Sequence, residues 1–279
     1  MRPRKRLIAC VAALLLATGG CVDLEEIAQF AEVSQGVGKA FPVIADEAAA
    51  SCNRANSYIT EKNQVTPLPC EIYPALKPSL VKVNAALFNY IASLGKLASA
   101  DSSNISGGWD SLPGDLEKAD PEISPDNQAA AAAASELANA ITNLLIKGYR
   151  RHEVSKIIGE SNTALQEVTR FLSSYAAGKY HQSLADEWRY ERSYCDAMAT
   201  TAEPLATDLL GRKCNADKSR IDLQLHAIEE YKKSLATIAE THKKLDEQRK
   251  HWDAKQLSKD LGPAIISLGN AAVSMSNAF

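Results

Sequence analysis

Residues 24–59, LEEIAQFAEVSQGVGKAFPVIADEAAASCNRANSYI, indicate the fold class of this chain. Small or apolar residues recur in it every three or four positions, which is the spacing of one face of an α-helix. The series is Leu24, Ile27, Ala31, Ser34, Gly38, Phe41, Ala45, Ala48, Cys52, Ala55 and Ile59. We predict one long amphipathic helix, kinked at Pro42 because proline removes a helical hydrogen bond and crowds the preceding turn.

Two loops are predicted to flank a second helix. Residues 64–77 contain Pro67, Pro69 and Pro74, a density that indicates a loop. Pro78 suits the first turn of a helix, and the apolar spacing carries that helix to Ala98. Glycine and proline recur again from residue 101 to about residue 123, so we predict a second loop there.

The C-terminal half is also helical in pattern. From Ser124 to Ala202 there is no proline inside the helical pattern, and an unbroken helix of that length would measure about 110 Å. An interruption is therefore expected at one of three glycines, namely Gly148, Gly159 and Gly178. After a loop bounded by cysteines, a further helix is predicted from Ile221 until Gly262-Pro263 breaks it, followed by a short C-terminal helix.

Because no alternating strand pattern occurs, we predict an all-α fold. The expected architecture is an elongated antiparallel helical bundle of four main helices plus a short C-terminal helix.

The N-terminus has the organisation of an export signal. Basic residues at positions 2, 4, 5 and 6 precede an apolar run over residues 7–17, and Thr18-Gly19-Gly20-Cys21 follows. This order resembles the lipobox of bacterial lipoproteins, although Thr18 stands where that family usually has Leu. The resemblance implies that residues 1–20 are a signal peptide and that Cys21 becomes the lipidated first residue of the mature domain, 21–279.

The same resemblance implies a location in the bacterial cell envelope. Val22, rather than Asp, follows the cysteine, which in such lipoproteins favours the outer membrane, with the domain facing the periplasm. The alternatives are a membrane-spanning anchor, for which the apolar run is too short, and the cleaved signal of a soluble secreted protein. The membrane is thus an expected partner, through the N-terminal lipid.

Four cysteines of the mature domain fall into two local pairs. Cys52 and Cys70 have 17 residues between them, and Cys195 and Cys214 have 18. In an oxidising compartment we predict a disulfide within each pair, each contributing about 3 kcal/mol in the chain-entropy model. The alternative of a metal or redox site is less favoured, since the chain has no Cys-x-x-Cys motif and no nearby histidine.

Charge and motifs exclude several functions. Removal of the signal, with its four basic residues, leaves 27 basic and 34 acidic side chains and a net charge of −7, so nucleic acid is not an expected partner. No histidine follows a glutamate by three positions, and Lys156 replaces the second histidine of a zinc-protease motif that would begin at His152. We predict no catalytic residue, no metal, no cofactor and no enzymatic activity.

Aromatic residues concentrate between Tyr175 and Tyr194. Tyr180 and Trp188 share one helical face with Leu184, which indicates core packing, whereas Arg189, Tyr190 and Arg192 spread around other faces. Aromatic and arginine side chains are enriched at protein interfaces, so these last three residues are predicted partner-binding residues.

Trp109 is a further candidate binding residue. It is an isolated large side chain in the predicted loop, where it either docks onto the bundle or meets a ligand. Three function classes remain: a non-enzymatic interaction or structural module with an envelope protein as partner, a carrier of a lipid or other apolar ligand held between helices, and an enzyme without a recognised motif. The first is the leading hypothesis.

Overall fold

A computed structural model describes residues 24–59, 66–99, 125–147, 151–200 and 203–279. These ranges are almost entirely helical and contain no strand, which confirms the all-α prediction. The elements are α2 Glu25–Tyr58, α3 Ile72–Ala98, α5 Pro125–Lys147, α6 Arg151–Tyr175, the π-helical turn η3 Ala176–Tyr180, α7 His181–Ala199, α8 Pro204–Gln248 and α9 Ala254–Ser276.

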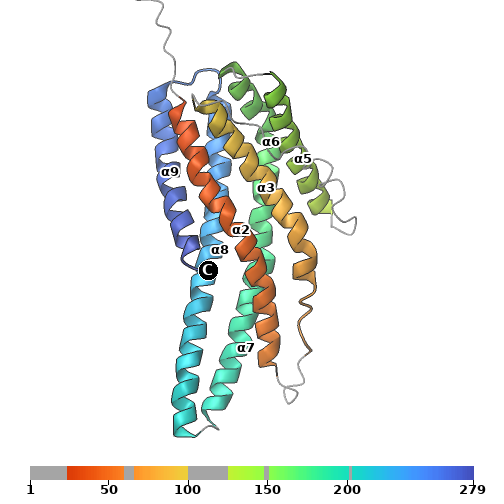
Figure 1. The fold of residues 1–279 in the computed structure, drawn as a ribbon, viewed down its shortest axis with the longest axis vertical. Helices are drawn as coiled ribbons and strands as arrows, with labels where there is room; N and C mark the ends of the chain where they lie inside the picture. Colours follow the sequence, from red (N-terminus) through yellow and green to blue (C-terminus); the bar gives the residue numbers. More distant parts are fainter. Residues whose placement is uncertain (1–23, 60–65, 100–124, 148–150, 201–202) are drawn as a thin grey trace, which may run out of the picture.

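The helices form an elongated bundle (Figure 1). Successive helices run in opposite directions in the pairs α2–α3, α5–α6, α7–α8 and α8–α9, while α6, η3 and α7 form one continuous rod. The 45 residues of α8 make a rod of about 67 Å at 1.5 Å per residue, which runs along most of the bundle (Figure 1). The prediction was four main helices and a short C-terminal helix. In the structure α5 is a helix of its own, and the C-terminal helix α9 has 23 residues.

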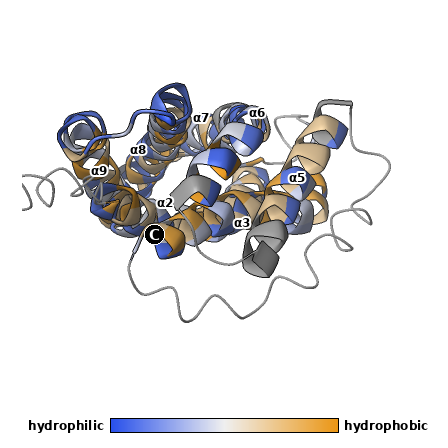
Figure 2. Cartoon of the chain, turned by 90° about the horizontal axis from the view of Figure 1, so that it is seen from above, coloured by the Kyte–Doolittle hydropathy of each residue, from blue (hydrophilic) through white to orange (hydrophobic). Residues whose placement is uncertain are grey.

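Small residues let α2 and α3 approach closely. A Cβ atom at Gly95 would lie 2.5 Å from Ala31 Cβ, and one at Gly38 would lie 2.4 Å from Phe88 Cγ. Seen along the bundle, hydrophilic residues lie on the outer faces of α8 and α9 (Figure 2). The seam predicted from residues 24–59 is therefore the contact face of α2.

Prolines end fewer helices than predicted. Residues 64–77 are not all loop, because α3 begins at Ile72 and includes Pro74 and Pro78. Pro74 lies in the first turn, where a backbone N–H has no helical acceptor to lose. Gly262-Pro263 likewise lies inside α9, and the break occurs earlier, at residues 249–253.

Capping and burial explain the position of that break. The Asp253 side chain accepts a hydrogen bond of 2.9 Å from the Gln256 amide and so caps α9. Buried Trp252 donates its indole N–H to the Leu245 carbonyl at 3.1 Å. The turn is thereby fixed without proline.

The three candidate glycines behave differently. Gly148 lies outside the described residues, between the end of α5 at Lys147 and the start of α6 at Arg151. Gly159 continues α6, and a Cβ there would lie 2.8 Å from Arg249 Nε. Gly178 lies in η3, where the helix widens by a π-turn without ending.

Candidate functional site

The hairpin of α7 and α8 extends beyond the other helices at one end of the bundle (Figure 1). Tyr58, the last residue of α2, lies with its ring 5.6 Å from the Tyr194 ring and its hydroxyl 3.3 Å from Asp217 Oδ2. The described residues between positions 195 and 214 therefore lie past the end of α2. We call the described residues of this segment, 196–200 and 203–213, the hairpin tip.

The hairpin tip exposes large apolar side chains. Leu205 is 75% exposed, Leu209 is 59% exposed and Met198 is 37% exposed. We expected a loop between Cys195 and Cys214, and these three residues were not among the predicted site residues. Pro204 at the first helical position, followed by two leucines one turn apart, is the signal that would have identified them.

Both predicted disulfides are confirmed. Cys52–Cys70 joins α2 to the residues before α3, with the Cα atoms 5.6 Å apart. Cys195–Cys214 joins α7 to α8 at the base of the hairpin tip, with the Cα atoms 6.3 Å apart. The cysteines of the second pair lie inside helices rather than at the edges of a loop, because α8 begins at Pro204 and not near Ile221.

An ion cluster around buried Glu187 joins the hairpin to α2. Glu187 of α7 is fully buried and accepts hydrogen bonds from Arg54 Nε at 2.6 Å and from Arg220 at 2.5 Å. Burial by itself raises the pKa of Glu187, but the hydrogen bonds from the two guanidinium groups outweigh it and hold this pKa below its ordinary value. Arg54 also contacts Glu47, so three helices share the cluster.

The predicted partner-binding residues lie just above the hairpin tip. Arg189 and Arg192 are exposed, and Tyr190 is half-buried. The Arg189 guanidinium stacks 4.9 Å above the Tyr190 ring and pairs with Asp186 at 2.7 Å, while Arg192 lies 3.8 Å from Asp196. Cys21 and Trp109 lie outside the described residues.

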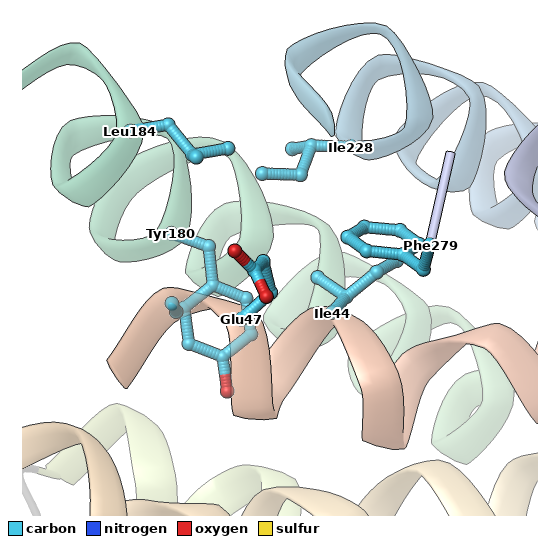
Figure 3. Close-up of a pocket in the computed structure, with 7 residues that line it drawn as sticks. Ile44, Glu47, Tyr180, Leu184, Ile228 and Phe279 are labelled. Carbon is cyan, nitrogen blue, oxygen red and sulfur yellow. The ribbon is translucent and has the colours of Figure 1, made fainter. Parts of the chain in front are cut away.

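The predicted core face of the segment from Tyr175 to Tyr194 is buried only as far as Leu184. Tyr180 and Leu184 are buried as expected, but Trp188 is only half-buried and carries Lys218 5.8 Å above its ring. In Figure 3, Tyr180, Leu184 and Ile228 meet Phe279 around a small gap that has no room for a water molecule. This junction is packed core rather than a binding site.

A shallow groove of about 400 Å³ lies between α2 and α9. Its apolar lining includes Val43, Met275 and Phe279, and Lys39 adds a positive charge. The two helices approach closely at Gly36, where a Cβ would lie 2.8 Å from Ala272 Cβ, and the groove beside this contact is open toward solvent.

Buried polar side chains elsewhere serve packing. His242 of α8 accepts from Tyr90 at 2.8 Å through Nε2 and donates to Asn162 Oδ1 at 3.0 Å through Nδ1. Burial lowers the pKa of His242 to about 3, so the ring is neutral. With no exposed surface, it has no access to a substrate.

The chain matches no family model, no curated protein and no solved structure. Across the described ranges, none of the helices has both the length and the hydrophobicity needed to cross a bilayer.

Proposed function

We propose that this chain is a bacterial envelope lipoprotein, anchored through lipid on Cys21 to the outer membrane, whose helical bundle binds a second envelope protein. The single observation that carries the proposal is the exposed Leu205 and Leu209 on a disulfide-tied hairpin tip. The lipobox-like N-terminus and the two disulfides support an oxidising, extracytoplasmic location.

The arrangement of the bundle supports a membrane anchor at one end and a partner-binding surface at the other. The α2 helix begins at the end of the molecule opposite the hairpin tip (Figure 1). A lipid on Cys21, shortly before α2 in the sequence, holds that end of the bundle at the membrane. The hairpin tip at the other end then lies about the length of α8 away from the membrane. The tip is then the element most accessible to a partner in the periplasm.

The chemistry of the tip favours a protein partner with an apolar groove. Exposed apolar side chains that lie together mark interaction surfaces more often than isolated ones do. The Cys195–Cys214 disulfide and the Glu187 cluster order the hairpin before binding, which reduces the entropy lost on association. The proposed binding surface also includes Arg189, Tyr190 and Arg192, which lie on α7 a few residues before the hairpin tip.

Cysteine replacement tests the anchor. Cys21→Ser removes the thiol that lipidation requires, so we expect the variant to carry no acyl mass and to leave the membrane fraction. Mass measurement of the mature N-terminus and membrane fractionation give the answer. A wild-type N-terminus that is free and unacylated would refute the anchor.

Site-directed crosslinking tests the interaction surface. A photo-crosslinking residue at exposed Arg212 should give one discrete adduct in intact cells. Leu205→Ser combined with Leu209→Ser should abolish that adduct, while Leu223→Ser, at a leucine 51% exposed on the same helix outside the tip, should leave it unchanged. An adduct that is insensitive to both tip leucines would contradict the proposal.

A second candidate function is carriage of an acyl chain with an anionic head group. The α2–α9 groove of about 400 Å³ favours it, because the groove is apolar and Lys39 supplies a positive charge. Native mass spectrometry of purified protein tests it directly. A bound acyl lipid that is lost in Val43→Asp supports the carrier, and a bare protein opposes it.

A further inference from the structure

A buried carboxyl group lies against the hairpin disulfide. Glu191 of α7 is 1% exposed, and its Oε1 atom lies 4.0 Å from Cys195 Sγ. One carboxyl oxygen and the sulfur atoms of Cys195 and Cys214 all lie within 4.8 Å of one another. The second oxygen, Oε2, is buried and makes no hydrogen bond to any described residue. An ionised carboxylate with an unsatisfied oxygen is costly to bury, so this geometry favours the protonated form.

The surrounding charges act in both directions on Glu191. Burial raises the pKa of Glu191, and the nearby carboxylates of Asp217 and Glu187 raise it further, whereas Lys213 and Arg220 lower it. The net direction is upward, which is the direction that keeps a proton on the group. The groups that interact with Glu191 come from α7, α8 and α2: Glu187, Lys213, Asp217, Arg220 and Tyr58.

The two disulfides differ in access. Cys52 is 2% exposed and Cys70 is 7% exposed, and the Asn56 amide lies 3.3 Å from Cys70 Sγ. Cys195 and Cys214 are both partly exposed and lie on the projecting hairpin. Thiol–disulfide exchange requires an attacking thiolate to reach one sulfur, so the hairpin disulfide is the accessible one.

We propose that Cys195–Cys214 is a redox-active disulfide that exchanges with a dithiol reductant, and that Glu191 supplies the proton to the departing Cys195 sulfur. A thiolate of the reductant attacks Cys214 Sγ and forms a mixed disulfide, and the Cys195–Cys214 bond breaks. Cys195 leaves as a thiolate and takes the proton of the Glu191 carboxyl. The second thiolate of the reductant then attacks its own sulfur in the mixed disulfide and releases Cys214. Two electrons pass from the dithiol, which becomes a disulfide, to the hairpin.

Competitive reduction within one molecule tests this proposal. The mature protein is treated with dithiothreitol under native conditions, quenched by alkylation at intervals, and each cysteine is quantified by peptide mass spectrometry. We expect Cys195–Cys214 to open at least about tenfold faster than Cys52–Cys70, because both access and proton donation favour it. Since both disulfides meet the same reagent, the ratio of the two rates cancels the ionisation of dithiothreitol.

Two matched variants isolate Glu191. Glu191→Gln should lower the rate ratio by about tenfold at neutral pH, because an amide hydrogen-bonds but does not give up a proton. Asp196→Asn removes an exposed carboxylate beside Cys195 and should leave the ratio unchanged. Circular dichroism and melting temperature verify that each variant is folded.

The pH profile provides a second readout that folding defects do not imitate. In the wild type the ratio should fall as pH rises and Glu191 loses its proton, and in Glu191→Gln it should stay level. Identical pH profiles in the two proteins would overturn the role of Glu191. Opening of Cys52–Cys70 before Cys195–Cys214 would overturn the redox assignment, and neither result bears on the lipid anchor.

Discussion

Asn84 of α3 donates a hydrogen bond of 3.0 Å to the Gly38 carbonyl of α2. That carbonyl is the one that Pro42, four residues later, leaves without a helical donor. The Asn84 side chain in turn accepts a hydrogen bond of 2.9 Å from the Tyr231 hydroxyl of α8. A proline inside one helix is thus compensated by a buried amide on a second helix and a phenol on a third.

We predict that Asn84→Ala destabilises the protein by about 3 kcal/mol, because it leaves a buried carbonyl and a buried hydroxyl without partners. Chemical denaturation followed by circular dichroism measures the change. Asn53→Ala, at an exposed asparagine on α2, is the control and should have little effect. A loss below about 1 kcal/mol in Asn84→Ala would indicate that the bridge contributes little.

A second prediction concerns helix separation. Gly38→Ala should destabilise by about 2 kcal/mol, since its Cβ would overlap the buried Phe88 ring. Gly269→Ala in α9 meets nothing within 4 Å and should stabilise by up to about 1 kcal/mol, because alanine is the better helix former. Thermal unfolding of the two variants measures both effects. Equal shifts of the melting temperature in the two variants would contradict the close approach of α2 and α3.

A third prediction follows from the neutral His242. Its pKa is lowered from 6.5 to about 3 on folding, so the unfolded chain binds a proton in this range that the folded chain does not. Stability must therefore fall as pH drops from about 6.5 toward 3, by about 1 kcal/mol per pH unit.

The variant His242→Gln, which does not titrate, should have a flatter dependence of unfolding free energy on pH. His226→Gln, at an exposed histidine of the same helix, is the matched control. If both variants keep the wild-type slope between pH values of about 6.5 and 4, His242 is not the group that titrates.

A fourth prediction separates packing from binding on α7. Replacing Arg189, Tyr190 and Arg192 by Ala should change stability by no more than about 1 kcal/mol, because the lost ion pairs are solvent-exposed. The same variant should weaken the crosslink formed from the hairpin tip. Lys243→Ala with Lys244→Ala, exposed higher on α8, controls for loss of charge. Early melting without loss of the crosslink would assign the three residues to packing.

Much of the fold follows from residue spacing. The recurrence from Leu24 to Ile59 predicts the buried face of α2, and local sequence separation predicts both disulfides. These are short-range properties: a helix places residues three and four apart on one side, and a short chain segment keeps two cysteines near each other.

Boundaries at proline are less predictable, because they depend on partners elsewhere in the chain. Pro42 lies inside its helix, where Asn84 supplies a replacement hydrogen bond from another helix. Pro204 begins α8 instead of only ending what precedes it, and this difference turns a predicted loop into the hairpin tip. The Asn84 contact is not visible in a short window of sequence, whereas the helix start at Pro204 has a local signal in the two leucines that follow it.

Residue spacing was enough to predict the all-α class, the apolar face of α2 and the pairing of the cysteines, since each depends on contacts within a few turns of chain. The tertiary structure was needed to show that Glu187 contacts Arg54 and that the hairpin tip extends past Tyr58. It also placed the unpartnered oxygen of Glu191 beside Cys195. The physical reason is that burial and charge at these side chains are set by which helices become neighbours, and residue spacing within one helix carries no record of that choice.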